Sequence, residues 1–311
     1  MAETTTSKES QKSQIKGWWA PAFVGAAALI FVASGWMWWH YVRSNPERTF
    51  YAAIENSLRT PGVTRQVQQD STGQKLDQRV QLSLGRQHVA HGQTTITQEG
   101  EVNATIKTEA ISSPKEDYVR YTAIETTQKS QDGKALDFSK LINLWGKAVP
   151  DAQGQQGQSQ AGELYNESVL GVVPVGNLRG HDRADVMKFV RETSVYSVDA
   201  KKIKRKIENG RPVYAYDITV MPEAYIGMLK KFGKAVGLKQ LEAVDPASYK
   251  DTEPLTFQVS VDVWSRQLSS IVFGGGERTE HMVGYGVVRN VDIPKETIPL
   301  EELQTRLQAV Q

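Results

Sequence analysis

The sequence of 311 residues contains no cysteine. That absence excludes disulfide bonds, thiol catalysis, metal sites with cysteine ligands and a lipid anchor on an N-terminal cysteine. Neither sign of charge is in large excess, because the sequence has 37 Lys and Arg residues and 35 Asp and Glu residues. We therefore expect no nucleic-acid partner, and any attachment to a membrane must be made by the polypeptide itself.

Common catalytic motifs are missing as well. The sequence has no G-x-S-x-G elbow, no H-E-x-x-H pair, no G-x-x-x-x-G-K loop and no G-x-G-x-x-G fingerprint. His88 and His91 are the closest of the five histidines, but residues i and i+3 of a strand point to opposite faces and cannot jointly bind a metal. We predict a protein that is not an enzyme and that has no cofactor and no metal site.

A long run without charged residues stands near the start, at residues 17–39. As a helix it spans about 33 Å from Trp18 to Trp39, which matches a hydrocarbon core of about 30 Å. Amphipathic aromatic residues flank both ends, where they would anchor at the membrane interface: Trp18, Trp19, Trp36, Trp38, Trp39 and Tyr41. The sequence thus predicts a single-pass transmembrane helix at residues 17–41, named here the predicted span.

A buried core helix and a cleaved signal peptide are the alternatives to this span. The flanking aromatic residues argue against a core helix. A signal peptide is contradicted by the length of the run and by the bulky residues 36–41, which occupy positions where signal peptidase needs small ones. We interpret the run as an uncleaved signal anchor.

The orientation of the span is predicted from the flanking positive charges. Lys8, Lys12 and Lys16 precede it, whereas Arg43 and Arg48 follow it. By this margin the positive-inside rule favours a short cytoplasmic tail at residues 1–16 and an extracytoplasmic domain at residues 46–311, in a bacterial cell membrane.

Beyond the span, the hydrophobic pattern changes from helical to alternating. Phe50, Ile54 and Leu58 have helical spacing after the Asn45-Pro46 start signal. Alternation then begins around residues 76–84 and recurs at residues 88–98, 101–111 and 117–126, with short links between the segments. Such short links predict an antiparallel meander, because parallel neighbours need crossovers of about a dozen residues or more.

The second half of the chain mixes helical and strand patterns. Helical spacing occurs at residues 138–145, 164–172, 184–193, 222–236 and 300–307, and residues 151–162 lack large apolar side chains and are typical of a surface loop. Strand patterns occur at residues 201–207, 212–220, 255–264, 268–274 and 281–293. Asn209-Gly210 predicts a hairpin between the first two of these strands.

The C-terminal third resembles a known family. Residues 261–264 (Val-Asp-Val-Trp), residues 267–273 and residues 291–303 are similar to the closing strands of bacterial envelope proteins of the LolA and LppX/LprG type. The resemblance implies an α+β fold in which a strongly curved antiparallel sheet forms a half-open barrel and helices cover its concave face. It also implies an apolar cavity that holds lipid or acyl chains. Members of that family have a lipid anchor or none, whereas this chain has a predicted transmembrane anchor.

The candidate ligand-lining residues lie where the amphipathic helix at 222–236 would face the strands. They are Tyr214, Tyr216, Tyr225, Met228, Leu229, Phe232, Phe257, Val259 and Val261. Alternation alone does not distinguish a filled core from a cavity, so an ordinary packed core explains them equally. Our first hypothesis is a membrane-tethered domain that binds a lipid ligand. The second is a structural module that binds another envelope protein, and an enzyme of unfamiliar type is the third.

The basic run Lys201, Lys202, Lys204, Arg205 and Lys206 has two interpretations. Lysines commonly protect a solvent-exposed edge strand against pairing with other chains. Clusters of basic residues close to a bilayer also bind anionic headgroups.

Overall fold

The computed structural model describes residues 29–35, 37, 45–148 and 162–310. The chain divides into two units, residues 1–48 and 49–311. Residues 29–35 of the first unit are helical, and none of the described helices is both long and apolar enough to cross a membrane. The predicted tail, most of the predicted span with its six flanking aromatic residues, and nearly all of the loop predicted at 151–162 lie outside the described residues.

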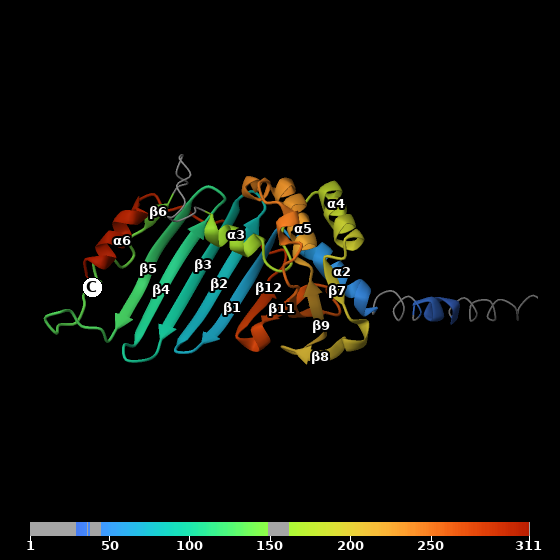
Figure 1. The fold of residues 1–311 in the computed structure, drawn as a ribbon, viewed down its shortest axis with the longest axis horizontal. Helices are drawn as coiled ribbons and strands as arrows, with labels where there is room; N and C mark the ends of the chain where they lie inside the picture. The colour runs from blue at the N-terminus through green and yellow to red at the C-terminus, as the bar shows by residue number, and fades with distance from the viewer. Residues whose placement is uncertain (1–28, 36, 38–44, 149–161, 311) are drawn as a thin grey trace, which may run out of the picture. The chain divides into compact units, whose positions relative to one another are not determined.

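A large, curved, mostly antiparallel open sheet forms the second unit (Figure 1). Its order is β13-β6-β5-β4-β3-β2-β1-β12-β11-β10-β9-β7, with β8 also paired to β9, and only the short β13–β6 pair is parallel. The strands are β1 Gly62–Ser71, β2 Gln74–Leu84, β3 His88–Gln98, β4 Ala104–Ser112, β5 Asp117–Thr126, β6 Gly146–Ala148, β7 Tyr196–Val198, β8 Lys204–Glu208, β9 Arg211–Val220, β10 Leu255–Asp262, β11 Leu268–Phe273, β12 Arg278–Val283 and β13 Ile298–Pro299. The antiparallel meander predicted from residue 76 to residue 126 is confirmed by the successive pairing of β2 to β5. Strand β1, which was not predicted, extends it by pairing with β2.

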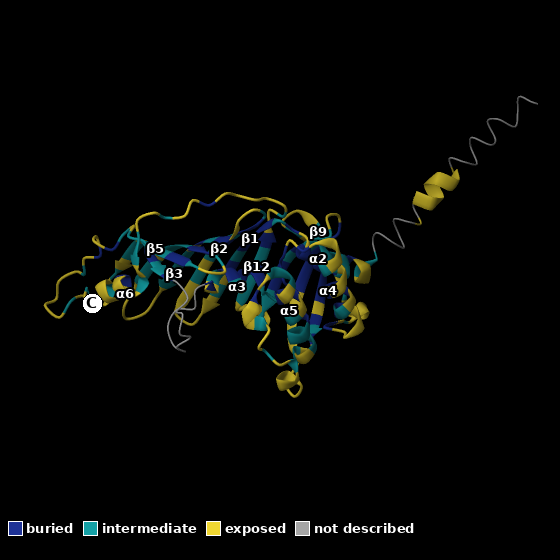
Figure 2. Cartoon of the chain, turned by 90° about the horizontal axis from the view of Figure 1, so that it is seen from above, coloured by how far each residue is buried: buried dark blue, intermediate teal, exposed yellow. Residues whose placement is uncertain are grey.

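Besides the helical residues 29–35, the described α-helices are α2 Pro46–Leu58, α3 Glu163–Val169, α4 Gly180–Glu192, α5 Pro222–Val236 and α6 Leu300–Gln308. Short 3-10 turns occur at η2 Ala200–Lys202, η3 Lys239–Leu241, η4 Pro246–Tyr249 and η5 Gly274–Gly276. Helix α5 begins with a first-turn proline and ends where Gly237 takes a positive φ of 80°. Figure 2 shows α3, α4 and α5 on one side of the sheet.

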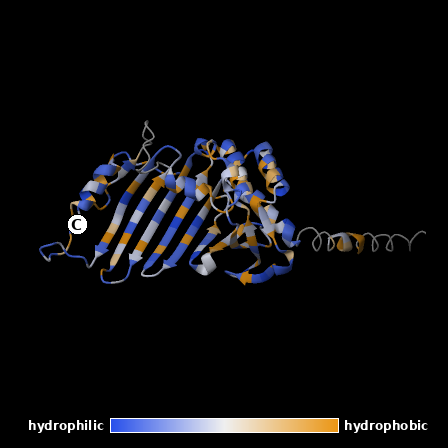
Figure 3. Ribbon diagram, in the orientation of Figure 1, coloured by the Kyte–Doolittle hydropathy of each residue, from blue (hydrophilic) through white to orange (hydrophobic). Residues whose placement is uncertain are grey.

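The main core lies between these helices and one face of the sheet, called here the helix face. Phe50 of α2 packs its ring against Tyr196 and Tyr216, with centroids 5.9 and 5.3 Å apart. Strand alternation supplies the other side of the core, for example Val80 and Leu82 of β2, which are almost fully buried. The same alternation is visible as changing hydropathy along β1 to β5 in Figure 3.

Two predicted elements are wrong. Residues 138–145 form turns instead of a helix, and Phe138 and Leu141 pack against Leu303 of α6. The strand predicted at 281–293 ends at Val283. Gly284 and Gly286 follow with φ of 65° and 82°, a conformation outside the β region, so the ladder stops there.

Residues 284–297 instead form an irregular strap over the outer face, the face of the sheet opposite the helix face. The Ser83 hydroxyl donates to the Arg289 carbonyl at 2.9 Å and accepts from the Arg289 N–H at 3.2 Å. Val291 packs with Val89, Ile111 and Tyr118. The strap therefore connects β12 to β13 across the meander and buries part of its outer face.

A charged cluster also lies on the outer face, on β3, β4 and β5. The Glu109 carboxylate accepts hydrogen bonds from His91 Nε2 at 2.7 Å and from Arg120 Nε at 2.8 Å. The Arg120 guanidinium lies 4.6 Å from the centroid of the Trp145 ring. Partial burial raises the pKa of Glu109, but the bonds from His91 and Arg120 outweigh this, so its pKa lies below the ordinary value of 4.5.

Acid is expected to weaken this cluster. Because the folded pKa of Glu109 is depressed, its contribution to stability is present above pH 4.5 and is lost as the pH falls through the folded pKa. Denaturant unfolding followed by circular dichroism between pH 3 and 7, on the wild type and on Glu109→Gln, measures it. The free energy of unfolding should rise less between pH 3 and 7 in Glu109→Gln than in the wild type. The same pH profile in both proteins would contradict the lowered pKa of Glu109.

Candidate functional site

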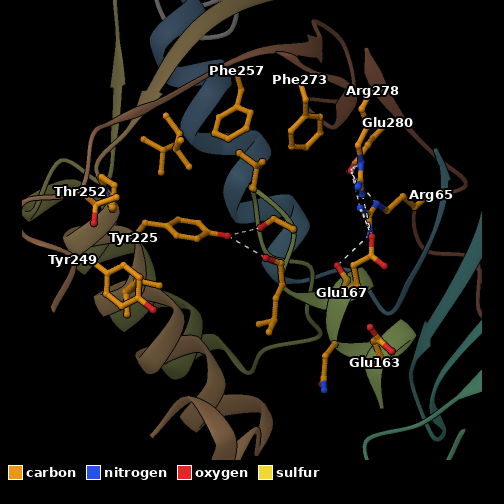
Figure 4. Close-up of a pocket in the computed structure, with 18 residues that line it drawn as sticks. Arg65, Glu163, Glu167, Tyr225, Tyr249, Thr252, Phe257, Phe273, Arg278 and Glu280 are labelled. Atoms are coloured by element: carbon orange, nitrogen blue, oxygen red, sulfur yellow. Dashed lines mark hydrogen bonds and ion pairs between the residues drawn. The ribbon is translucent and has the colours of Figure 1, made fainter. Parts of the chain in front are cut away.

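A cavity of about 800 Å³ lies against the helix face (Figure 4). Strands β1, β9, β10, β11 and β12 supply one wall, and α3 with the following turn supplies a second. The start of α5, together with the region around η4, supplies a third. The lining residues are Arg65, Glu163, Asn166, Glu167, Leu170, Gly171, Val172, Val220, Pro222, Tyr225, Ile226, Tyr249, Thr252, Leu255, Phe257, Phe273, Arg278 and Glu280. Its size falls within the range of small-molecule sites, about 300–1,000 Å³.

One part of the cavity wall is aromatic and aliphatic. Phe257 of β10 and Phe273 of β11 meet edge to face, with ring centroids 5.1 Å apart and an interplanar angle of 80°. The register explains this placement. Val259 pairs with Ile271 in antiparallel strands, so Phe257, two residues before Val259, lies beside Phe273, two residues after Ile271, on the same face. Leu170, Val172 and Ile226 line the cavity as well. This wall offers apolar surface and few hydrogen-bonding groups to an occupant.

A paired ion cluster adjoins this aromatic part of the wall, and the Arg278 guanidinium lies 5.4 Å from the centroid of the Phe273 ring. Arg65 of β1 donates to both Glu280 carboxylate oxygens, at 2.9 and 2.6 Å, and its side chain and that of Glu280 are only 6% and 1% exposed. Arg278 reaches the same carboxylate at 2.9 Å and Glu167 of α3 at 3.0 Å. With Glu163 included, three carboxylates face two guanidinium groups among the cavity residues. The cavity therefore carries no surplus positive charge for an anionic group.

Two tyrosine hydroxyls hold the turn that follows α3. The Tyr225 hydroxyl is shared between the carbonyl oxygens of Leu170, at 3.0 Å, and Gly171, at 2.8 Å. The Tyr196 hydroxyl donates to the Val172 carbonyl at 2.8 Å. Burial raises the pKa of both tyrosines well above the ordinary value of 10.0, so both remain neutral donors. Their bonds fix the backbone of one cavity wall.

Replacing Tyr225 with phenylalanine is expected to lower the free energy of unfolding by about 1–2 kcal/mol, because two part-buried carbonyls lose a donor. Denaturant titration measures this loss. Tyr249→Phe is the matched control, since Tyr249 lines the same cavity but is 37% exposed and should change stability by less than about 0.5 kcal/mol. Equal effects of the two substitutions would contradict the role assigned to Tyr225.

The start of α3 is held by side chains from the sheet. Asp117 of β5 accepts from the Glu163 N–H at 3.2 Å and from the Ser112 hydroxyl at 2.5 Å, and that hydroxyl in turn accepts from the Tyr165 N–H at 3.0 Å. Burial raises the pKa of Asp117, although these hydrogen bonds oppose the shift. The contacts satisfy N–H groups that have no partner inside the helix. They fix the position of Glu163 and Glu167 at the cavity.

No family model matches the sequence, and no curated protein matches it. The crystal structure of LprF from Mycobacterium bovis is similar to this chain with a TM-score of 0.41 and 12% sequence identity, over 81% of this chain and 97% of that chain.

The structure places the predicted ligand-lining residues in two environments. Tyr225 and Phe257 line the cavity. The other seven are buried in the main core: Tyr214, Tyr216, Met228, Leu229, Phe232, Val259 and Val261. The described residues contain no group of three or more side chains that could hold a metal ion.

The ion cluster and the turn at residues 170–172 were not predicted from the sequence. A signal for the cluster was present, because Arg65 stands between Val63 and Val67 at a position that alternation assigns to the buried face. A charged residue at such a position requires a partner. Its partner Glu280 lies 215 residues away along the chain, and sequence spacing does not predict that contact.

Proposed function

We propose that this chain is a non-enzymatic domain, tethered to the bacterial cell membrane by the predicted span, whose cavity binds the apolar part of a lipid or acyl chain. The domain is extracytoplasmic in this proposal, and the sheet acts as a half-open barrel with helices over its concave face. The observation that carries it is the cavity of about 800 Å³ with an aromatic and aliphatic wall.

The chemistry of the cavity supports an apolar occupant. An alkyl chain gains about 0.8 kcal/mol for each CH₂ group that it buries, and Phe257, Phe273 and Ile226 offer the surface for it. The guanidinium groups of Arg65 and Arg278 are already paired with carboxylates, so they are not free for a headgroup. We therefore expect an alkyl chain in the cavity and no anionic group beside the ion cluster.

Lipid analysis of the purified full-length chain tests this proposal. The protein is extracted in detergent and washed with an excess of a second detergent, and native mass spectrometry then records any retained lipid. Ile226→Trp is expected to abolish retention, because the indole fills part of the cavity that Ile226 lines. Val102→Trp is the matched control, since Val102 is 39% exposed and does not line the cavity.

Retained lipid in the wild type and in Val102→Trp, but not in Ile226→Trp, is the expected result. A wild-type protein that carries no lipid and acquires none from added vesicles would overturn the proposal. Equal retention by all three proteins would place the lipid elsewhere and would overturn it as well.

A further inference from the structure

A basic strand that is exposed to solvent lies at the edge of the sheet beside β9. Residues 201–207, called here the basic edge, comprise the last two residues of η2, Ile203 and the first four residues of β8. They include five Lys and Arg side chains and no carboxylate, and all but Ile203 are exposed. Ile207 is 70% exposed among them. Basic side chains around an exposed aliphatic residue form a surface suited to a layer of anionic headgroups above hydrocarbon.

Part of this charge has no partner within the domain. Lys202 pairs with Asp199 at 3.6 Å, and Lys206 pairs with Glu208 at 3.6 Å. Lys201, Lys204 and Arg205 form no ion pair with the part of the chain that the structure describes. At least three positive charges are therefore available to an external anion.

The basic edge lies close to the point where the chain enters the domain. Phe50, in the first half of α2, packs its ring 5.3 Å from that of Tyr216 on β9. The preceding residues of β9 pair with the basic edge, Ala215 with Lys204 and Tyr214 with Arg205. In Figure 1, α2, β7, β8 and β9 accordingly lie at the same end of the sheet.

The length of the tether limits the distance between this end and the membrane. Four residues, 42–45, separate Tyr41 at the end of the predicted span from Pro46 at the start of α2. The five Cα–Cα steps from Tyr41 to Pro46 reach at most about 18 Å even when fully extended. If the span crosses the bilayer, the membrane surface is thus within a short distance of the start of α2.

We infer that the basic edge is a docking surface for the anionic phospholipid headgroups of the membrane that holds the predicted span. Lys201, Lys204 and Arg205 contact the phosphates, and Ile207 reaches the boundary of the hydrocarbon. The inference rests on the predicted span and is independent of the cavity. The competing explanation is that the lysines only prevent edge pairing with other chains.

A single introduced cysteine distinguishes the two explanations, because the chain has no other cysteine. The full-length Ile207→Cys chain is labelled with a polarity-sensitive fluorophore and reconstituted in phosphatidylcholine vesicles, with or without phosphatidylglycerol. We expect a blue shift and quenching by nitroxide-labelled lipid only in the anionic vesicles. The control label is placed at Val102→Cys, in the turn between β3 and β4, and should respond in neither.

Removing the basic side chains tests whether they bind the anionic headgroups. Each basic side chain near an anionic surface favours contact by roughly fivefold, so combining Lys201→Ser, Lys204→Ser and Arg205→Ser should abolish the quenching at position 207. The control combines Lys129→Ser, Lys134→Ser and Lys140→Ser, which removes the same charge from exposed positions outside the basic edge and should change nothing. Raising the salt concentration to 0.5 M should release the basic edge of the wild-type protein from the anionic vesicle surface. Equal quenching in neutral and anionic vesicles, or no association with either, would overturn the inference.

Discussion

Replacing Glu280 with glutamine is expected to lower the free energy of unfolding by about 3–5 kcal/mol. Glu280 is 1% exposed and is the carboxylate that both Arg65 and Arg278 contact. Without it, the buried Arg65 guanidinium keeps only its bonds to Glu167, at 3.1 Å to the carbonyl and 3.4 Å to the carboxylate. The buried Arg65 charge is then only partly compensated, which accounts for most of the expected loss. Denaturant titration followed by circular dichroism measures it.

Two further variants separate this effect from general damage. Combining Arg65→Met with Glu280→Leu removes both buried charges and should recover most of the lost stability, because apolar residues of similar size often replace a buried ion pair at little cost. Glu302→Gln breaks an exposed pair with Arg306 on α6 and should cost less than about 1 kcal/mol. A double variant no more stable than Glu280→Gln would contradict the charge explanation.

Strand positions were predictable where one face of the sheet is buried and turns are short. Along β2, Val80, Leu82 and Leu84 are buried by the main core. A shift of one residue would expose them all, so the register follows from the pattern. The Asn209-Gly210 hairpin was predictable for a local reason, because both residues take positive φ, 50° and 75°, as a type I′ turn requires.

The wrong elements lie where tertiary contacts replace periodic hydrogen bonding. Phe138 and Leu141 have helical spacing, but they bury themselves against Leu303, a residue from the far end of the chain. In the strap at residues 284–297, Val291 is buried on the outer face without belonging to a strand. An apolar residue in a sequence indicates that the side chain is buried, but it does not indicate whether the backbone at that position is a helix, a strand or a loop.

The cavity was harder to predict than the sheet. Phe232 and Tyr225 belong to the same amphipathic helix, yet Phe232 is fully buried in the core, whereas Tyr225 lines the cavity. The hydrophobic pattern identifies the side of α5 that faces the sheet, but an empty volume depends on how α3, α5 and η4 are spaced above it. That spacing is set by long-range contacts, such as those of Tyr225 with the turn after α3.

This difference leads to a paired prediction for two phenylalanines. Phe232→Ala is expected to lower the free energy of unfolding by about 3–5 kcal/mol, because a fully buried ring is lost and the site cannot collapse completely. The ring packs so closely on the backbone that a Cβ added at Gly176 would lie 2.8 Å from it. The part of the protein that remains folded should still retain lipid, since Phe232 does not line the cavity.

Phe257→Ala should have the opposite profile, with a stability loss of about 1–2 kcal/mol and a clear loss of retained lipid. Phe257 is only partly buried and contributes to the cavity wall together with Phe273. Its removal therefore takes away less buried core surface than the removal of Phe232, and it takes away apolar surface that contacts the ligand. Native mass spectrometry of both variants, corrected for the folded fraction from circular dichroism, gives the comparison. If both variants lose lipid only in proportion to unfolding, Phe257 is part of the core alone and the cavity is not the binding site.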